Sequence, residues 1–227
     1  LTTGGEEKAM LLFAALCIGL IVLQKDLGAV LICFLTCLTV YYVATSNALL
    51  ALSGIACAAA GSVVLYRLFP HVQTRVAIWK NPWASPQDGG YQIIQSLIAI
   101  ASGGMTGLGL GKGTPTVVPV VESDFIFAAL CEEFGIAVGL FALALYVILF
   151  WRGLTLAMRA RSSFHALLAV GAVTCMSLQT FMIVGGVIKL IPLTGVTMPY
   201  ISYGGSSMLS CMLMLGILQG VSVAVGE

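Results

Sequence analysis

Apolar residues dominate six stretches of the sequence, and polar residues lie mainly between them. Each stretch approaches or reaches the roughly 20 apolar residues that a helix needs to cross about 30 Å of hydrocarbon. The pattern therefore predicts an all-α protein, a polytopic bundle of about six transmembrane helices in a single membrane domain, residues 1–227. The stretches cover residues 9–23, 27–45, 48–69, 125–150, 166–190 and 206–225.

The long polar segment 70–123 is rich in glycine and proline, and we expect it to lie outside the membrane. Within it, Tyr91–Ala101 is apolar enough for a short interfacial helix, with a re-entrant segment as the alternative. The glycine-rich sequence that follows predicts a flexible return. Its spacing fits neither GxGxxG nor GxxxxGK[ST], and no strand precedes it, so we exclude a nucleotide site.

Basic residues in short loops favour the cytoplasm and so set the expected orientation. The loop 151–165 holds no acidic residue and three arginines, Arg152, Arg159 and Arg161. With this loop inside, segment 70–123 becomes an extracytoplasmic loop, and the polar turns near 24–26 and 192–205 face the same side. This convergence suggests a site at the outer membrane surface, although loops of alternating helices share a face in any bundle.

Composition agrees with insertion into a membrane. Of the 227 residues, 59% are hydrophobic and 8% are charged, whereas about a quarter of a soluble domain is charged. The net charge of +1 gives no basic excess, so we expect no nucleic acid partner. The seven cysteines lie in apolar runs without the CxxC pairs or histidines of a zinc site, and we interpret them as small hydrophobic residues.

Three polar clusters could carry chemistry, and Gln24–Gly28 is the first. Apolar residues flank it closely, so we expect Asp26 near the headgroups or in a cavity, with a solvated turn as the alternative. The third, residues 191–207, combines two prolines with glycines and hydroxyl groups. Non-helical backbone at membrane depth is tolerated only against protein or a watery cavity, so this cluster should line a site, unless its small residues only allow tight helix packing.

The second cluster contains Asp124, at the start of the fourth stretch. A carboxylate at the mouth of a spanning helix is partly desolvated, which raises its pKa and suits it to act as a base on a hydroxyl. A helix cap by Asp124 or Ser123 is the alternative. Glu132 and Glu133 lie about 12 Å further along the same predicted helix, where they need partners. We hypothesise pairing with Lys189 or Arg67; a purely structural role is the alternative.

In this order, the clusters resemble the SEDS family of shape, elongation, division and sporulation proteins. The family's QPDxG turn is similar to Gln24–Gly28, and its glycine-rich outer loop is similar to Gly90–Gly113. Its TDFIF...EE.G and P.TG...P..SYGGSS signatures are similar to residues 123–135 and 192–207. Four positions differ from the family pattern: Lys25, Val120, Glu122 and Ile183.

The resemblance implies a peptidoglycan glycosyltransferase of the bacterial cytoplasmic (inner) membrane, which polymerises lipid II into glycan strands at its outer face. Asp124 would be the catalytic base. A divalent cation, Mg²⁺ or Mn²⁺, is an additional candidate at the diphosphate. The implied substrate-binding residues are Arg75, Lys80 and Lys112 on the diphosphate, together with Asp26, Glu132, Glu133, Ser202, Tyr203, Gly204, Gly205 and Ser206.

The family has about ten spanning helices against about six here, and the sequence lacks an initiator Met, so we expect a truncated chain. The implied partners are undecaprenyl-diphosphate-linked glycan and a class B penicillin-binding protein, a transpeptidase. Solvated loop charges are the alternative for Lys80 and Lys112. The competing functions are a flippase for the lipid-linked precursor and a non-catalytic scaffold, which would not require an acid at Asp124.

Overall fold

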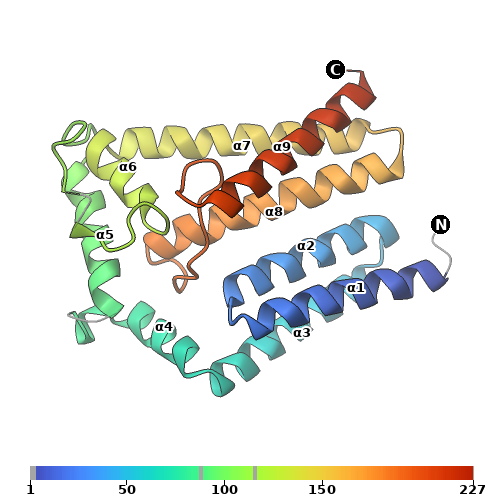
Figure 1. Cartoon of the computed structure of the whole chain (residues 1–227), viewed down its shortest axis with the longest axis horizontal. Helices are drawn as coiled ribbons and strands as arrows, with labels where there is room; N and C mark the ends of the chain where they lie inside the picture. Colours follow the sequence, from blue (N-terminus) through green and yellow to red (C-terminus); the bar gives the residue numbers. More distant parts are fainter. Residues whose placement is uncertain (1–3, 87–88, 115–116, 227) are drawn as a thin grey trace.

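A computed structural model describes residues 4–86, 89–114 and 117–226, and within these residues all regular structure is helical (Figure 1). Its helices follow one another along the chain in the order α1 Gly4–Leu23, α2 Leu27–Thr45, α3 Ala48–Leu68, α4 Pro70–Lys80, the 3-10 helix η1 Pro82–Ala84, α5 Gly89–Gly103, α6 Ile126–Phe134, α7 Ile136–Arg159, α8 Ser163–Val187 and α9 Gly205–Val225.

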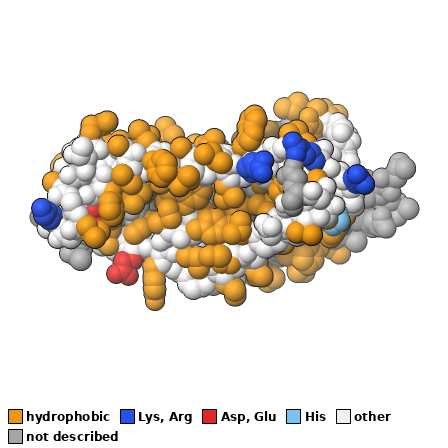
Figure 2. Space-filling view, turned by 90° about the horizontal axis from the view of Figure 1, so that it is seen from above, with side chains coloured by type: hydrophobic (Ala, Val, Ile, Leu, Met, Phe, Trp, Pro, Cys, Tyr) orange, Lys and Arg blue, Asp and Glu red, His pale blue; other side chains and the backbone are white. Residues whose placement is uncertain are grey.

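Five of the described helices, α2, α3, α7, α8 and α9, are long and apolar enough to cross a membrane. The apolar part of α1, Leu12–Leu23, is shorter. No residue of α3 is buried, although the helix is strongly apolar, so its surface is suited to lipid rather than to water. Hydrophobic side chains cover most of the face in Figure 2, and few charged side chains interrupt them. The predicted all-α, multi-pass membrane protein is confirmed.

The polar segments gather at one end of the bundle, on the left in Figure 1. There α5 runs across the direction of the long helices, and α4, η1 and α6 lie beside it. The turn between α1 and α2 and the segment 188–204 between α8 and α9 reach the same end. The predicted helix Tyr91–Ala101 is confirmed as part of α5. The predicted gathering of the three polar clusters on one side is also confirmed.

The prediction of one continuous helix over residues 125–150 is wrong, because the chain breaks at Gly135. This residue has φ 87° and ψ 163°, a conformation open almost only to glycine. A β-carbon there would lie 2.3 Å from the carbonyl oxygen of Met105. The spanning helix α7 therefore begins at Ile136, and Glu132 and Glu133 precede it on the separate helix α6.

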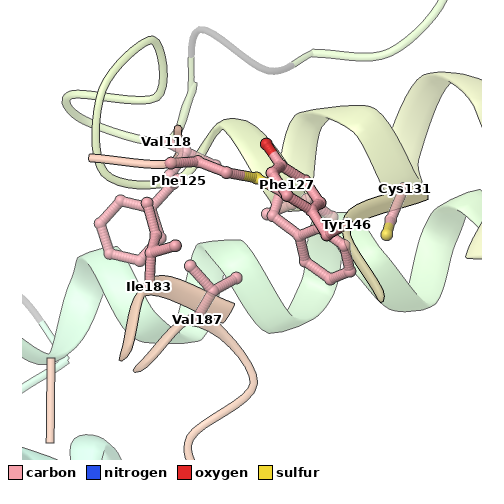
Figure 3. Close-up of a cluster of buried hydrophobic side chains, with 10 residues drawn as sticks. Val118, Phe125, Phe127, Cys131, Tyr146, Ile183 and Val187 are labelled. Atoms are coloured by element: carbon pink, nitrogen blue, oxygen red, sulfur yellow. The ribbon is translucent and has the colours of Figure 1, made fainter. Parts of the chain in front are cut away.

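A buried hydrophobic cluster joins α6 to the long helices (Figure 3). Phe125, which immediately precedes α6, has no exposed surface, and the side chains of Ile183 and Val187 on α8 lie beside it. The hydroxyl of Tyr146 on α7 donates a hydrogen bond to the carbonyl oxygen of Pro199 in segment 188–204. This core fixes the backbone directly after Asp124.

The glycine-rich loop 104–114 packs against the carboxyl end of α6. The amides of Leu108 and Gly109 donate to the carbonyl oxygens of Glu132 and Glu133, each at 2.9 Å, and so satisfy the free carbonyls of the helix end. A β-carbon on Gly107 would lie 2.2 Å from the Glu133 oxygen. Close backbone packing therefore accounts for glycine at position 107.

We expect Gly135→Ala to lower the free energy of unfolding by about 2 kcal/mol or more, because an alanine cannot adopt this backbone conformation without strain. The measurement is thermal unfolding of the purified protein in detergent, followed by tryptophan fluorescence. Gly216→Ala in α9 is the matched control, since no atom lies within 4 Å of its β-carbon position. An equal loss of stability in both variants would contradict this account of the helix break.

Candidate functional site

The non-helical segment 188–204 lies at the centre of the site, and the other site elements contact it. Lys189, Gly195 and Tyr200 in this segment all have positive φ angles, so the chain turns sharply several times between α8 and α9. These turns expose backbone carbonyl and amide groups that need hydrogen-bond partners. The partners come from α4, from residues 122 and 123 of the second polar cluster and from Ser202 in the segment itself. The first cluster joins them through close packing of Gly28 on Val196.

Arg75 and Trp79 fasten α4 to this segment. Nη1 of Arg75 donates to the carbonyl oxygens of Leu193 at 3.2 Å and Thr194 at 2.9 Å. Nε1 of Trp79 donates to the carbonyl oxygen of Lys189 at 3.1 Å. Trp79 could not be singled out from the sequence, because a single tryptophan near a membrane interface is usually an anchor in the headgroup region.

The turn 24–28 packs against the same segment. Asp26 caps α2, since its Oδ1 accepts a hydrogen bond of 3.0 Å from the amide of Ala29. Gly28 is buried, and a β-carbon there would lie 2.8 Å from Cγ2 of Val196. Only glycine allows this close approach, which accounts for glycine at position 28.

Ser202 and Tyr203 join segment 188–204 to the backbone beside Asp124. Ser202 Oγ donates to the carbonyl oxygen of Ser123 at 2.6 Å and accepts from the amide of Met198 at 2.8 Å. The amide of Tyr203 donates to the carbonyl oxygen of Glu122 at 2.8 Å. Ser202 is only 3% exposed, so it acts as a structural link and not as a substrate ligand. The Tyr203 side chain remains exposed.

Asp124 is partly buried, and its carboxylate does not cap α6. The N-cap of that helix is Phe125, and no side chain caps it, so the alternative of a cap by Asp124 or Ser123 is wrong. Asp124 Oδ2 and Arg75 Nη2 lie 3.7 Å and 3.8 Å from the position that a β-carbon on Gly195 would occupy. Gly195 therefore leaves open the space between a carboxylate and a guanidinium group.

Two cavities lie on opposite sides of backbone segment 193–197. The first, of about 600 Å³, is apolar along α2, α3 and α8, and Lys25, His71, Arg75 and Thr194 are among its lining residues. His71 Nε2 and Thr194 Oγ1 are buried and have no hydrogen-bond partner in the described chain. Buried polar atoms without partners indicate a place for a polar group or water. Sequence reasoning missed His71 because a lone histidine in a polar loop carries little signal.

The second cavity, of about 530 Å³, lies between α2, α8 and α9 and is lined by many polar side chains. Gln179 Oε1 is buried there without a partner, and Thr36 Oγ1 has only the thiol of Cys175 nearby, a weak partner. Thr194 lines the first cavity, whereas Gly195 and Val196 line the second, so the segment separates them. The polar lining includes Asp26, Thr36, Gln179, Thr197, Ser206, Ser207 and Ser210.

The remaining predicted residues lie at the edge of this site or away from it. Gly204 and Gly205 form the amino end of α9, and Lys80 is exposed at the end of α4. Tyr200 is not a candidate acid or base, because burial, followed by the nearby Cys211, raises its pKa to about 12. Its hydroxyl instead donates to the carbonyl oxygen of Cys211 at 3.0 Å.

Glu132, Glu133 and Lys112 do not converge with Asp124. Glu132 Oε1 accepts from the amide of Thr114 at 3.0 Å, and Glu133 Oε1 accepts from that of Gly111 at 3.2 Å. Both carboxylates thus hold the loop at the far end of α6, about 12 Å along the helix from Asp124. Their partners in the described chain are loop amides, and Oε2 of the buried Glu132 has none there. The hypothesis of ion pairs with Lys189 or Arg67 is therefore not supported, and the structural alternative is.

Comparison with known proteins links this arrangement to cell-wall synthesis. The sequence model FTSW_RODA_SPOVE, described as "Cell cycle protein", matches residues 6–226. The chain is 48% identical over 206 residues to the peptidoglycan glycosyltransferase RodA of Mycobacterium tuberculosis, which covers 90% of this chain and 44% of that protein. It is 37% identical over 209 residues to stage V sporulation protein E of Bacillus subtilis, covering 89% and 56%.

Comparison with solved structures also finds a protein of cell-wall synthesis. A chain from work on structural coordination of polymerization and crosslinking by a peptidoglycan synthase complex matches with a TM-score of 0.77 and 26% identity. The match covers 96% of the chain described here and 62% of the other. The chain thus spans about half the length of the curated relatives that it matches.

We expect Ser202→Ala to loosen residues 120–124, because it leaves the Met198 amide and the Ser123 carbonyl without their partner. The cost should be about 1–3 kcal/mol, the usual penalty for buried polar groups that lose a hydrogen bond. Amide hydrogen exchange should rise in residues 120–126 and stay unchanged in α7. Ser210→Ala, at an exposed serine whose hydroxyl bonds only Ser206, is the control. Unchanged exchange near Asp124 in Ser202→Ala would refute the link.

Proposed function

The chain belongs to the FtsW/RodA/SpoVE family of cell cycle proteins, and we propose that it carries the catalytic base of a peptidoglycan glycosyltransferase. The proposed reaction polymerises lipid II into glycan strands at the outer face of the bacterial cytoplasmic membrane. The observation that supports it most is the position of Gly195. The Asp124 carboxylate and the Arg75 guanidinium both lie within 4 Å of its β-carbon position. Arg75 also lines the apolar cavity, and Gly195 lines the polar cavity.

Asp124 is the proposed general base. Its carboxylate would accept the proton of the acceptor sugar hydroxyl while that oxygen bonds to the anomeric carbon of the donor. The bond between the anomeric carbon and the diphosphate oxygen breaks, and the diphosphate carrier leaves with the bonding electrons. A positioned base of this kind contributes about 10²–10⁴-fold to a rate. Partial burial and the absence of a capping role suit Asp124 to this task.

Arg75 is the proposed partner of the leaving diphosphate. Its bonds to the carbonyls of Leu193 and Thr194 hold the guanidinium in one orientation, and Nη2 remains directed toward Gly195. Preorganised charge of this kind stabilises developing negative charge without reorganisation. Lys25 and the unpartnered Nε2 of His71 line the same cavity and add to the diphosphate site. The geometry does not support a role there for Lys112.

The apolar cavity suits the polyprenyl tail of the substrate, and the polar cavity suits its sugars. Burial of a long hydrocarbon chain along α2, α3 and α8 is favourable, because each Å² of apolar surface removed from water contributes about 25 cal/mol of stabilising free energy. The hydroxyls and the Gln179 amide of the second cavity match the hydrogen-bonding groups of a sugar. Backbone segment 193–197, between the two cavities, would then hold the diphosphate that links the tail to the sugar.

A divalent cation, Mg²⁺ or Mn²⁺, belongs to the proposal only as a companion of the diphosphate. The described residues contain no group of three or more His, Cys, Asp or Glu suited to a metal. Mg²⁺ is often held by one carboxylate, substrate phosphates and water. The Asp124 carboxylate and the Arg75 guanidinium both lie within 4 Å of the β-carbon position of Gly195. A class B penicillin-binding transpeptidase is the proposed partner, supported by the similarity to a peptidoglycan synthase complex.

Asp124→Asn should abolish glycan formation, with a loss of about 10²-fold or more, because an amide cannot take the proton. The assay follows polymer formation from purified lipid II in liposomes. It should use a polypeptide of the relatives' full length together with its transpeptidase partner. Glu122→Gln is the matched control, since this exposed carboxylate lies two residues away.

Full activity of Asp124→Asn would sink the base assignment. No polymer from the folded parent protein would favour a flippase or a scaffold instead. Transport of a fluorescent precursor analogue across the same liposomes would separate these two outcomes.

Gly61→Phe should raise the KM for a substrate with a long polyprenyl tail, with a smaller effect on a short-tailed analogue. Gly61 lines the apolar cavity, and no atom lies within 4 Å of its β-carbon position, so a side chain can start there and extend into the proposed tail groove. Gly216→Phe in α9, which has the same open surroundings, is the control. Equal effects on both substrates would contradict the assignment of the groove.

A further inference from the structure

The loop 104–114 presents apolar side chains to its surroundings and packs none of them into the core. Met105 is 67% exposed, Leu108 is 43% exposed and Leu110 is 76% exposed. We call these three residues the apolar loop face. Folding does not require it, because the loop is already fixed through its backbone and through the carboxylates of Glu132 and Glu133.

The glycines explain why this face points outward. Gly107 and Gly113 lie against α6, where β-carbons would meet the Glu133 carbonyl oxygen at 2.2 Å and the Glu132 carboxyl carbon at 3.0 Å. The residues between them carry their side chains on the free side of the loop. Leu108 and Leu110 alternate with glycines, so the loop offers leucines to something outside the described chain.

The apolar loop face continues the lipid-facing surface of α7. The amides of Ile136 and Ala137, in the first turn of α7, donate to the carbonyl oxygens of Gly104 and Met105 at 2.9 Å and 3.4 Å. Further along α7, Leu140 is 59% exposed and Phe141 is 62% exposed on a helix of spanning length. The loop therefore lies level with the end of a membrane span, where the hydrocarbon meets the headgroups.

Lys112 adds a charge suited to that depth. It is exposed, and its aliphatic chain lies over Gly109, whose β-carbon position is 3.3 Å from Cδ of the lysine. A lysine with its stem on an apolar surface and its ammonium free can reach the lipid phosphates. Anionic headgroups attract such a cation.

We propose that the loop 104–114 is a membrane anchor that inserts the apolar loop face into the outer part of the bilayer. Lys112 then contacts the lipid phosphates. Because the loop caps the carboxyl end of α6, the anchor sets the depth of that helix and of Asp124 at its other end. This inference rests on the membrane spans and does not depend on the proposed enzymatic reaction.

The test places one environment-sensitive fluorophore on the loop. All seven cysteines are first replaced, and a single cysteine is introduced by Leu110→Cys at the most exposed position of the face. The labelled chain is reconstituted in nanodiscs of phosphatidylcholine and phosphatidylglycerol. We expect a blue-shifted emission and a loss of intensity with lipids that carry a shallow nitroxide, with less loss from a deep nitroxide. Glu122→Cys, at an exposed position on the same end, is the control and should respond to aqueous iodide.

Two results would overturn the anchor. An unshifted emission at position 110 that is quenched by iodide would show a loop in water. A blue-shifted emission that no lipid nitroxide quenches would show a protein contact, such as a second copy of the chain. Because the readout requires no turnover, the anchor can succeed or fail whether or not the protein polymerises lipid II.

A second pair of variants connects the anchor to activity. Leu110→Asp should raise the KM for lipid II in liposomes, whereas Leu110→Phe should leave it unchanged, because only the aspartate opposes insertion. In detergent micelles the two variants should behave alike. A difference that persists in micelles would indicate a local effect on the loop and would contradict the anchor.

Discussion

Non-helical backbone at the end of a spanning helix must find hydrogen-bond partners, and the site is organised around the segment that meets this requirement. Segment 188–204 turns repeatedly through positive φ angles and satisfies only part of its carbonyl and amide groups internally, such as the Met198 carbonyl that accepts from the amides of Ile201 and Ser202. Arg75, Trp79 and Ser202 supply partners from α4 and from the segment itself. The same hydrogen bonds also hold α4 and residues 122–124, which precede α6, close to this segment.

The two sides of the segment have different chemistry because different helices face them. On one side α2, α3 and α8 present apolar side chains, and on the other α2, α8 and α9 present hydroxyl and amide groups. A substrate with a hydrocarbon tail and a sugar head therefore meets a matching environment for each part. Gly195 has a φ of +75°, and a β-carbon there would contact both the Asp124 carboxylate and the Arg75 guanidinium.

The carboxyl end of α6 shows a second use of backbone packing. Glycines at 107 and 113 allow the loop to approach the helix, and Glu132 and Glu133 bind the loop amides. The pair of glutamates that looked like intramembrane charges in a continuous helix is thus part of a structural joint. The prediction placed them in the spanning helix itself because Gly135 sits inside an apolar run, and hydrophobicity alone does not reveal a break that depends on one φ angle.

Hydrophobic length and motif order are local properties of the chain, so they were enough to predict the membrane-spanning helices and the gathering of polar clusters at one end. The same motif order marks Asp124 as the proposed base. It assigned Ser202 to substrate and missed His71, since both roles depend on neighbours far away in sequence. Three features emerged only in the folded chain: Ser202 holds the backbone of Ser123, Asp124 does not cap α6, and segment 193–197 lies between two cavities. These facts follow from hydrogen bonds and close approaches between distant segments, which no local pattern encodes.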